Sequence, residues 1–220
     1  DWLTTSAQNQ TYNSGNSISN WFPWAPDYQN AYRSFLNRLS LYLRNRHGAV
    51  PDAVVINAGG EYGEQVLGTY QYMTTMSSEE RDILYSAEKT FVEMHAEAFQ
   101  KLDCELIMLV NSLAPEDPSK DISVPIYASE LGVTWIQVNA GIWRLVSANA
   151  NDVAINKNDV ELLKNIKANI PNVKFILEDE SSSSEPPLGG GLPLKECVSR
   201  MNRLRSSDSI QFQGVTLNQR

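Results

Sequence analysis

Two glutamates, Glu61 and Glu64, lie in the segment Gly-Gly-Glu-Tyr-Gly-Glu at 59–64, directly after the apolar run 53–56. Such a run predicts a buried strand, and the C-terminal ends of parallel strands are where α/β proteins carry their chemistry. A carboxylate there can act as a general acid, a general base, a nucleophile or a metal ligand. The flanking glycines permit close approach to a ligand, which favours function over a solvated turn.

Polar side chains also follow the other apolar runs of the sequence. In chain order they are Asn57, Asn111, Asn139 with Trp143 beyond it, and the acids Glu178, Asp179 and Glu180. In a parallel sheet these strand ends lie at one edge, so we expect the side chains to form a single site. Carboxylates supply acid and base, amides bind hydroxyl groups, and an indole ring packs against the apolar face of a sugar.

The elements that position this site are predicted from hydrophobic periodicity. Strands are expected at 53–58, 105–110, 133–138, 173–177 and 210–217, and helices at 27–47, 77–102, 125–131, 158–170 and 193–205. Asp27 is the expected cap of the first helix, Ser77 with Glu80 of the second, and Asn158 with Glu161 of the fourth. Alternating helices and nearly all-apolar strands predict an α/β fold with a parallel sheet.

The chain is expected to form one domain over residues 21–220, preceded by an irregular, polar segment at 1–20. Residues 181–193, which read SSSSEPPLGGGLP, form a low-complexity stretch that predicts a mobile loop. This loop lies between a strand and its helix, so we do not interpret it as a linker between domains.

Composition excludes several classes of function. The 220 residues are 42% hydrophobic and carry a net charge of −8 without a basic cluster, which argues against nucleic acid and anionic membranes as partners. No run reaches the roughly 18 apolar residues of a membrane helix. Neither GxGxxG nor a Walker lysine is present, so no nucleotide cofactor is expected. Cys104 and Cys197 lack metal-ligand spacing; free thiols are the favoured interpretation, with a disulfide as the alternative.

The segment from Trp21 through Glu64 resembles the clan A glycoside hydrolases, (β/α)₈ barrels that include the β-galactosidase-like enzymes. The resemblance rests on an aromatic-proline lead, a helix with Asp-x-x-x-x-Tyr, the run Pro-Asp-Ala-Val-Val-Ile and the GGEYGE turn. It implies an acid/base glutamate at the end of strand four and a nucleophile at the end of strand seven. If 53–58 is strand four, then 173–177 is strand seven.

The resemblance implies retaining hydrolysis of a carbohydrate, with Glu64 or Glu61 as the acid/base, Glu64 being preferred, and Glu178 as the nucleophile. Asp179 and Glu180 are alternatives for the nucleophile. The implied substrate-binding residues are Asn57, Tyr62, Asn111, Asn139 and Trp143, and no metal or cofactor is implied. The Asn-Glu pair that the family carries at strand four is absent, because Asn57 is separated from Glu61.

A complete barrel of this type needs about 250 residues. We therefore expect a partial barrel, about strands four to eight with their helices, whose missing half comes from elsewhere or from a homo-oligomer. Two other functions are compatible with the sequence. One is a non-catalytic carbohydrate-binding or structural barrel, and the other is a site for Mg²⁺ or Ca²⁺ built from Glu61, Glu64 and Asp179.

Overall fold

The computed structural model describes residues 11–13, 19–21, 23–45, 50–56, 77–110, 118–138, 153–179, 202, 204–206 and 210–217. The chain divides into two compact units, each of which is described by itself below. The first unit comprises Asp1–Met108 and Glu130–Val133, and the second comprises Leu109–Ser129 and Thr134–Arg220.

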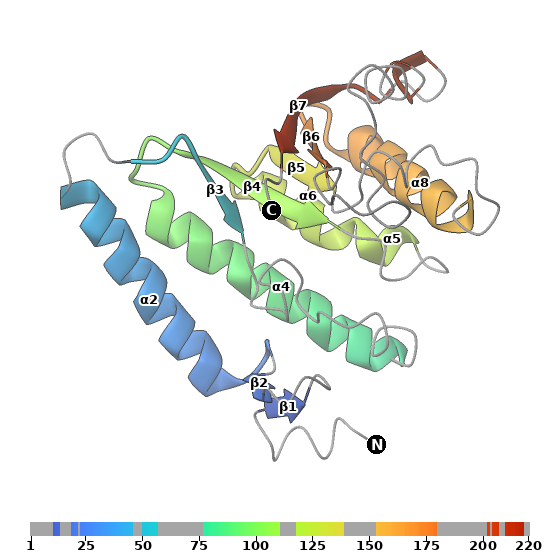
Figure 1. Cartoon of the computed structure of the whole chain (residues 1–220). Coiled ribbons are helices and arrows are strands. Elements are labelled where there is room, and N and C mark those ends of the chain that lie inside the picture. Colours follow the sequence, from blue (N-terminus) through green and yellow to red (C-terminus); the bar gives the residue numbers. More distant parts are fainter. Residues whose placement is uncertain are drawn as a thin grey trace, which may run out of the picture. The chain divides into compact units, whose positions relative to one another are not determined.

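The strands form the parallel sheet that the sequence predicts. Their order is β3 (Ala53–Ile56), β4 (Glu105–Val110), β5 (Trp135–Val138), β6 (Lys174–Asp179) and β7 (Phe212–Leu217) (Figure 1). The pairs β3–β4, β5–β6 and β6–β7 are parallel, and the helices of the chain alternate with the strands. The prediction of an α/β fold of the partial (β/α) barrel type is thereby confirmed.

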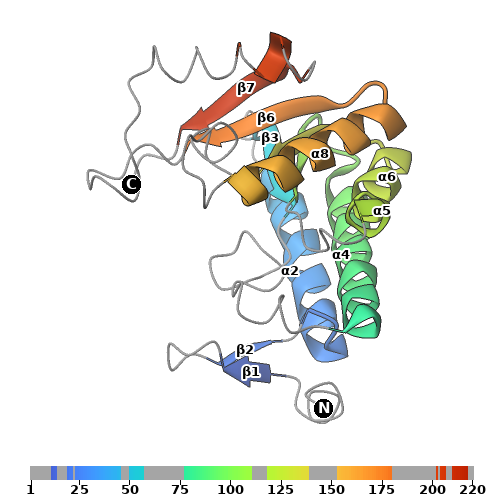
Figure 2. The same ribbon diagram turned by 90° about the vertical axis from the view of Figure 1, so that its right-hand side faces the viewer.

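Two long helices, α2 (Pro26–Asn45) and α4 (Ser78–Phe99), lie side by side in the first unit (Figures 1 and 2). The capping box of α4 is formed as predicted: the Glu80 N–H donates to Ser77 Oγ at 3.3 Å, and the Ser77 N–H donates to Glu80 Oε2 at 2.6 Å. Helix α2 differs from the prediction because it begins at Pro26, a residue favoured at the first helical position. Asp27 therefore lies inside the first turn rather than at the cap.

The core of the first unit forms where aromatic side chains of α2 meet α4. The Phe91 ring is fully buried, and its centroid lies 5.8 Å from that of Tyr28 and 5.0 Å from that of Tyr32. Other buried residues of α4 repeat at helical spacing, namely Leu84, Ala87, Met94, Ala98 and Phe99. The apolar residues whose periodicity predicts this helix therefore form its buried face.

Within residues 1–20, which we expected to be irregular, the structure describes two short antiparallel strands. These are β1 (Thr11–Asn13), which pairs with β2 (Ser19–Trp21) from Thr11 opposite Trp21 to Asn13 opposite Ser19. Strands of this length are too short to produce an alternating pattern, although Thr, Tyr and Trp all favour strands.

The second unit contains α5 (Pro118–Asp121), most of α6 (Ser123–Glu130) and α8 (Val153–Asn169). Helix α8 begins at Val153, so Asn158 and Glu161, the pair we expected to cap it, lie within the helix. Its buried residues are Leu162, Leu163 and Ile166, and Ile170 just beyond its end is also buried. Asn202 and residues 204–206 are helical, in agreement with the last predicted helix.

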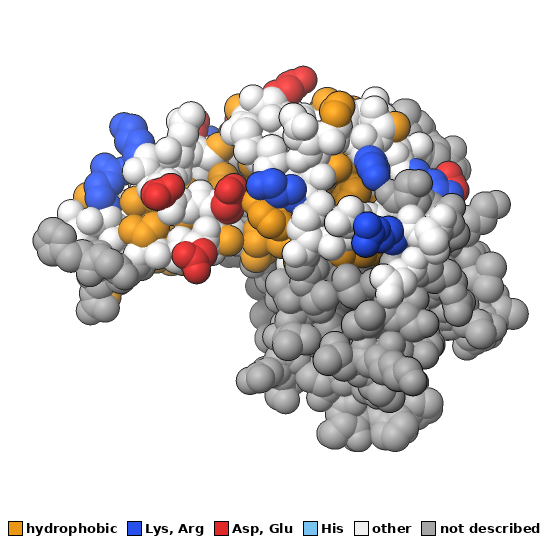
Figure 3. All heavy atoms as spheres, turned by 90° about the horizontal axis from the view of Figure 1, so that it is seen from above, with side chains coloured by type: hydrophobic (Ala, Val, Ile, Leu, Met, Phe, Trp, Pro, Cys, Tyr) orange, Lys and Arg blue, Asp and Glu red, His pale blue; other side chains and the backbone are white. Residues whose placement is uncertain are grey.

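The surface carries charges of both signs. On the face shown in Figure 3, Lys and Arg side chains are scattered, with acidic and apolar side chains between several of them. No described helix combines the length and hydrophobicity that a membrane-spanning segment requires.

Candidate functional site

The part of the candidate site that the structure describes lies at the C-terminal end of β6. Glu178 and Asp179 are the last residues of β6, where they pair in register with Thr216 and Leu217 of β7. The other predicted site residues lie outside the described residues; they are Asn57, Glu61, Tyr62, Glu64, Asn111, Asn139, Trp143 and Glu180. The acid/base and nucleophile assignments therefore stay predictions, and of the two only Glu178 has a described strand position.

A β-bulge precedes these strand ends. The register between β6 and β7 pairs Phe175 with Phe212 and then Ile176 with Gly214, so Gln213 is an extra residue on β7. The Gln213 side chain compensates for the disrupted ladder, because its Oε1 accepts a hydrogen bond from the Phe175 N–H at 2.8 Å. Bulges bend a strand and are frequent at barrel rims and beside active sites. This one shifts the pairing between Phe175 and Ile176, in the strand that ends with Glu178 and Asp179.

The two faces of the β5–β6 pair differ in chemistry. Residues two apart in a strand share a face, and the register pairs Trp135 with Lys174 and Gln137 with Ile176. One face is apolar: Ile136 and Phe175 are opposite each other and buried, and Phe175 contacts Phe212 with ring centroids 6.3 Å apart. The other face is mixed; its described side chains are Trp135, Gln137, Lys174 and Ile176.

The mixed face holds buried polar atoms that have no hydrogen-bond partner among the described residues. Gln137 is only 6% exposed, and among the described residues its Oε1 has no hydrogen-bond donor. The indole Nε1 of Trp135 is likewise buried and unpartnered within the described part of the chain. Lys174 lies nearby, with its ammonium nitrogen 4.6 Å from the centroid of the Trp135 ring. Sequence reasoning missed Gln137, although a polar residue inside an apolar strand was the available signal.

His95 is also buried, but both of its ring nitrogens have hydrogen-bond partners. Its Nδ1–H donates to the Phe91 carbonyl at 2.8 Å, which leaves Nε2 to accept from the Tyr32 hydroxyl at 3.4 Å. Burial lowers the pKa of His95, and the Phe91 carbonyl opposes this shift more weakly. Burial, and then the neighbouring Tyr28, raise the pKa of Tyr32. This pair is neutral and structural, as expected for a satisfied core histidine.

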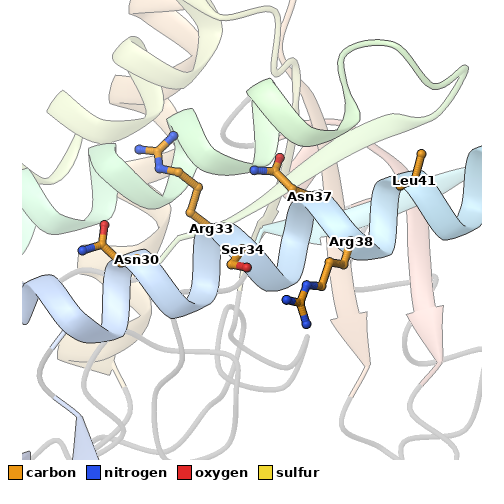
Figure 4. A pocket seen from close by; sticks show the side chains of 6 residues that line it. All are labelled: Asn30, Arg33, Ser34, Asn37, Arg38 and Leu41. Atoms are coloured by element: carbon orange, nitrogen blue, oxygen red, sulfur yellow. The ribbon is translucent and has the colours of Figure 1, made fainter.

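A shallow depression of about 410 Å³ lies against α2. The residues described along it, shown in Figure 4, are Asn30, Arg33, Ser34, Asn37, Arg38 and Leu41. All come from a single helix, and none is a carboxylate, so these residues supply no acid/base pair for catalysis.

The described residues contain no group of three or more His, Cys, Asp or Glu side chains that could hold a metal ion. Glu61 and Glu64 of the alternative metal site lie outside the described residues, so that alternative stays a prediction. Cys104 is a free thiol, and burial raises its pKa, followed by the effects of Asp103 and Glu105. Cys197 lies outside the described residues.

Comparison with known proteins finds a similar fold among the solved structures. The structure is similar to the PgaB (BpsB) glycoside hydrolase domain from Bordetella bronchiseptica, with a TM-score of 0.53 and 12% sequence identity. The similarity covers 95% of this chain and 63% of that domain, so the chain spans less than two thirds of its structural relative. The sequence matches no family model and no curated protein. At this identity the similarity establishes a glycoside hydrolase-like fold.

Proposed function

We propose that the chain is part of a glycoside hydrolase barrel that cleaves O-glycosyl bonds by a retaining mechanism with two carboxylates. The observation that carries the proposal is the position of Glu178 at the C-terminal end of β6, in a parallel sheet similar to that of a glycoside hydrolase domain. In such barrels the catalytic groups come from the C-terminal ends of strands.

In the proposed mechanism Glu178 attacks the anomeric carbon and Glu64 protonates the departing oxygen. Water then hydrolyses the glycosyl-enzyme, with Glu64 acting as the base. Retention requires the two carboxyl groups to lie about 5–5.5 Å apart, whereas inversion needs about 6.5–9.5 Å to accommodate a water. Glu61 is the alternative acid/base. Asn57, Asn111 and Asn139 bind sugar hydroxyls, and the rings of Tyr62 and Trp143 contact the sugar.

The proposal assigns β3 to barrel strand four and β6 to strand seven, within clan A. Strands one to three would come from outside the 220 residues, either from the rest of a longer protein or from a partner. That 63% of the structural relative is covered supports the absence of part of a barrel from these 220 residues.

The test uses the full-length protein and separates the two carboxylates by their chemistry. Glu178→Ala should lower kcat on 4-nitrophenyl glycosides by at least about 10³-fold, because no nucleophile remains. Azide should restore turnover of this variant and yield a glycosyl azide of inverted anomeric configuration. Glu64→Ala should keep kcat/KM on 2,4-dinitrophenyl glycosides, whose leaving group needs no proton, and lose it on unactivated ones.

Glu61→Ala and Asp179→Asn are the matched controls, and both should retain turnover. Loss of activity in Glu61→Ala instead of Glu64→Ala would exchange their roles. Normal turnover in both Glu178→Ala and Glu64→Ala would refute the mechanism. Saturable sugar binding without any hydrolysis would support the non-catalytic carbohydrate-binding alternative.

A further inference from the structure

Gln137 is an unusual residue for the interior of a parallel sheet. It is the third residue of β5, flanked by Ile136 and Val138, and it is 6% exposed. A buried amide oxygen without a donor carries a desolvation cost that an apolar side chain of similar size would avoid. Within the described part of the chain nothing offsets this cost for Gln137 Oε1.

The register places Gln137 near the proposed nucleophile. Gln137 pairs with Ile176, and position 178 is two residues further along the same face of β6. With about 3.3 Å of rise per residue and about 4.8 Å between strands, the Cα atoms of residues 137 and 178 lie roughly 8 Å apart. This separation suits one sugar ring held between an amide and a carboxylate.

From this arrangement we infer that Gln137 is a substrate-positioning residue whose Oε1 accepts a hydrogen bond from a hydroxyl of the sugar ring attacked by Glu178. The inference rests on the proposed function. The indole Nε1 of Trp135 on the same face, buried and without a partner among the described residues, is a second polar group available for hydrogen bonding in this region. Gln137 acts by orienting the sugar and takes no part in bond making or breaking.

The test is made in the full-length protein with Gln137→Leu, which removes the amide and approximately keeps its volume. The melting temperature should stay unchanged or rise by up to about 4 °C, because the unsatisfied group is gone. On 4-nitrophenyl β-D-galactoside, kcat/KM should fall about 10- to 100-fold. Ile136→Val on the apolar face is the matched control; it should lower the melting temperature and leave kcat/KM unchanged.

Monodeoxy galactosides identify the hydroxyl that Gln137 binds. One of the 2-, 3-, 4- and 6-deoxy substrates should lose about as much kcat/KM with the wild-type protein as Gln137→Leu loses with the parent substrate. The variant should show no further loss on that deoxy substrate, because the hydrogen bond is already absent. Gln137→Glu, which keeps an acceptor oxygen, should recover part of the lost kcat/KM.

A twofold or smaller change in kcat/KM for Gln137→Leu, with Glu178→Ala inactive, would overturn this inference and leave the proposed function intact. If an ordered water instead bridges Trp135 and Gln137, Gln137→Leu should show this small change in kcat/KM together with a lower melting temperature. Full turnover by Glu178→Ala with the expected loss in Gln137→Leu would overturn only the catalytic assignment. If the wild-type protein binds galactose but cleaves no galactoside, equal affinity of wild type and Gln137→Leu for galactose, measured by tryptophan fluorescence, would overturn the inference.

Discussion

The helix pair α2–α4 and the strand pair β5–β6 each bury a polar side chain. The two side chains differ in whether the described residues supply their hydrogen-bond partners. His95 is 1% exposed, and both of its ring nitrogens have partners, the Phe91 carbonyl and the Tyr32 hydroxyl. Gln137 is 6% exposed, and its Oε1 has no donor among the described residues. A buried polar group whose partners lie within the fold stabilises it, whereas one left unsatisfied marks a position where a ligand or an ordered water can bind.

The largest effect that tests this comparison comes from removing one buried ring in each region. Phe91→Ala and Phe175→Ala should each lower the free energy of unfolding by about 3–5 kcal/mol, because both rings are buried and leave a cavity. Only Phe175→Ala should also lower kcat/KM of the folded fraction, since Phe175 lies in β6 three residues before Glu178. Urea unfolding and initial rates on an aryl glycoside measure the two effects.

Equal losses of kcat/KM in these two variants would break the comparison, because the α2–α4 pair would then contribute to the site as much as β6 does. Unchanged kcat/KM in both variants would show that Phe175 contributes to stability but does not support the site.

How much of the fold and of the candidate site could be predicted from the sequence depends on how far apart in the sequence the interacting residues lie. The capping box at Ser77 and Glu80 was predictable because both partners lie within one turn. The parallel sheet was predictable from its apolar runs. The same local logic failed at Asn158 and Glu161, which match a cap but lie inside α8, because the helix begins earlier in the chain, at Val153.

Contacts between distant residues escaped sequence reasoning. The Tyr32–His95 hydrogen bond spans 63 positions, and the bond from the Phe175 N–H to Gln213 spans 38. No local pattern encodes either pairing, and a one-residue bulge leaves no periodicity of its own. The strand end that bears Glu178 was predictable from its position after an apolar run. The unsatisfied amide of Gln137 required knowledge of what surrounds β5.

A smaller effect concerns the protonation of His95. Because burial lowers its pKa below the usual value of about 6.5, the unfolded chain binds this proton more readily than the folded protein. The neutral imidazole therefore contributes its full stability above about pH 6.5, and this contribution is lost as the pH falls towards the lowered pKa of the folded state. His95→Leu should flatten this part of the pH dependence of the free energy of unfolding between pH 7.5 and pH 5.

Removing His95 should itself cost about 1–3 kcal/mol at pH 7.5, because the Phe91 carbonyl and the Tyr32 hydroxyl lose a partner. The chain has one other histidine, His47, which both proteins retain, so its titration cancels in the difference. Identical pH slopes for wild type and variant would show that His95 does not titrate differently in the two states. Gln137→Leu should leave the slope unchanged, since an amide does not titrate.

The smallest expected effect belongs to the ion pair between Arg33 of α2 and Glu97 of α4. These side chains are 37% and 60% exposed, so solvent screens their attraction. Arg33→Gln should lower the free energy of unfolding by only about 0.2–1 kcal/mol, and the difference should shrink in 0.5 M NaCl. The control is Arg38→Gln, whose side chain points to the other side of α2 in Figure 4. A larger loss that still shrinks in 0.5 M NaCl would show that α2 is held to α4 by charge as well as by its buried aromatic rings, which would weaken the contrast drawn from His95.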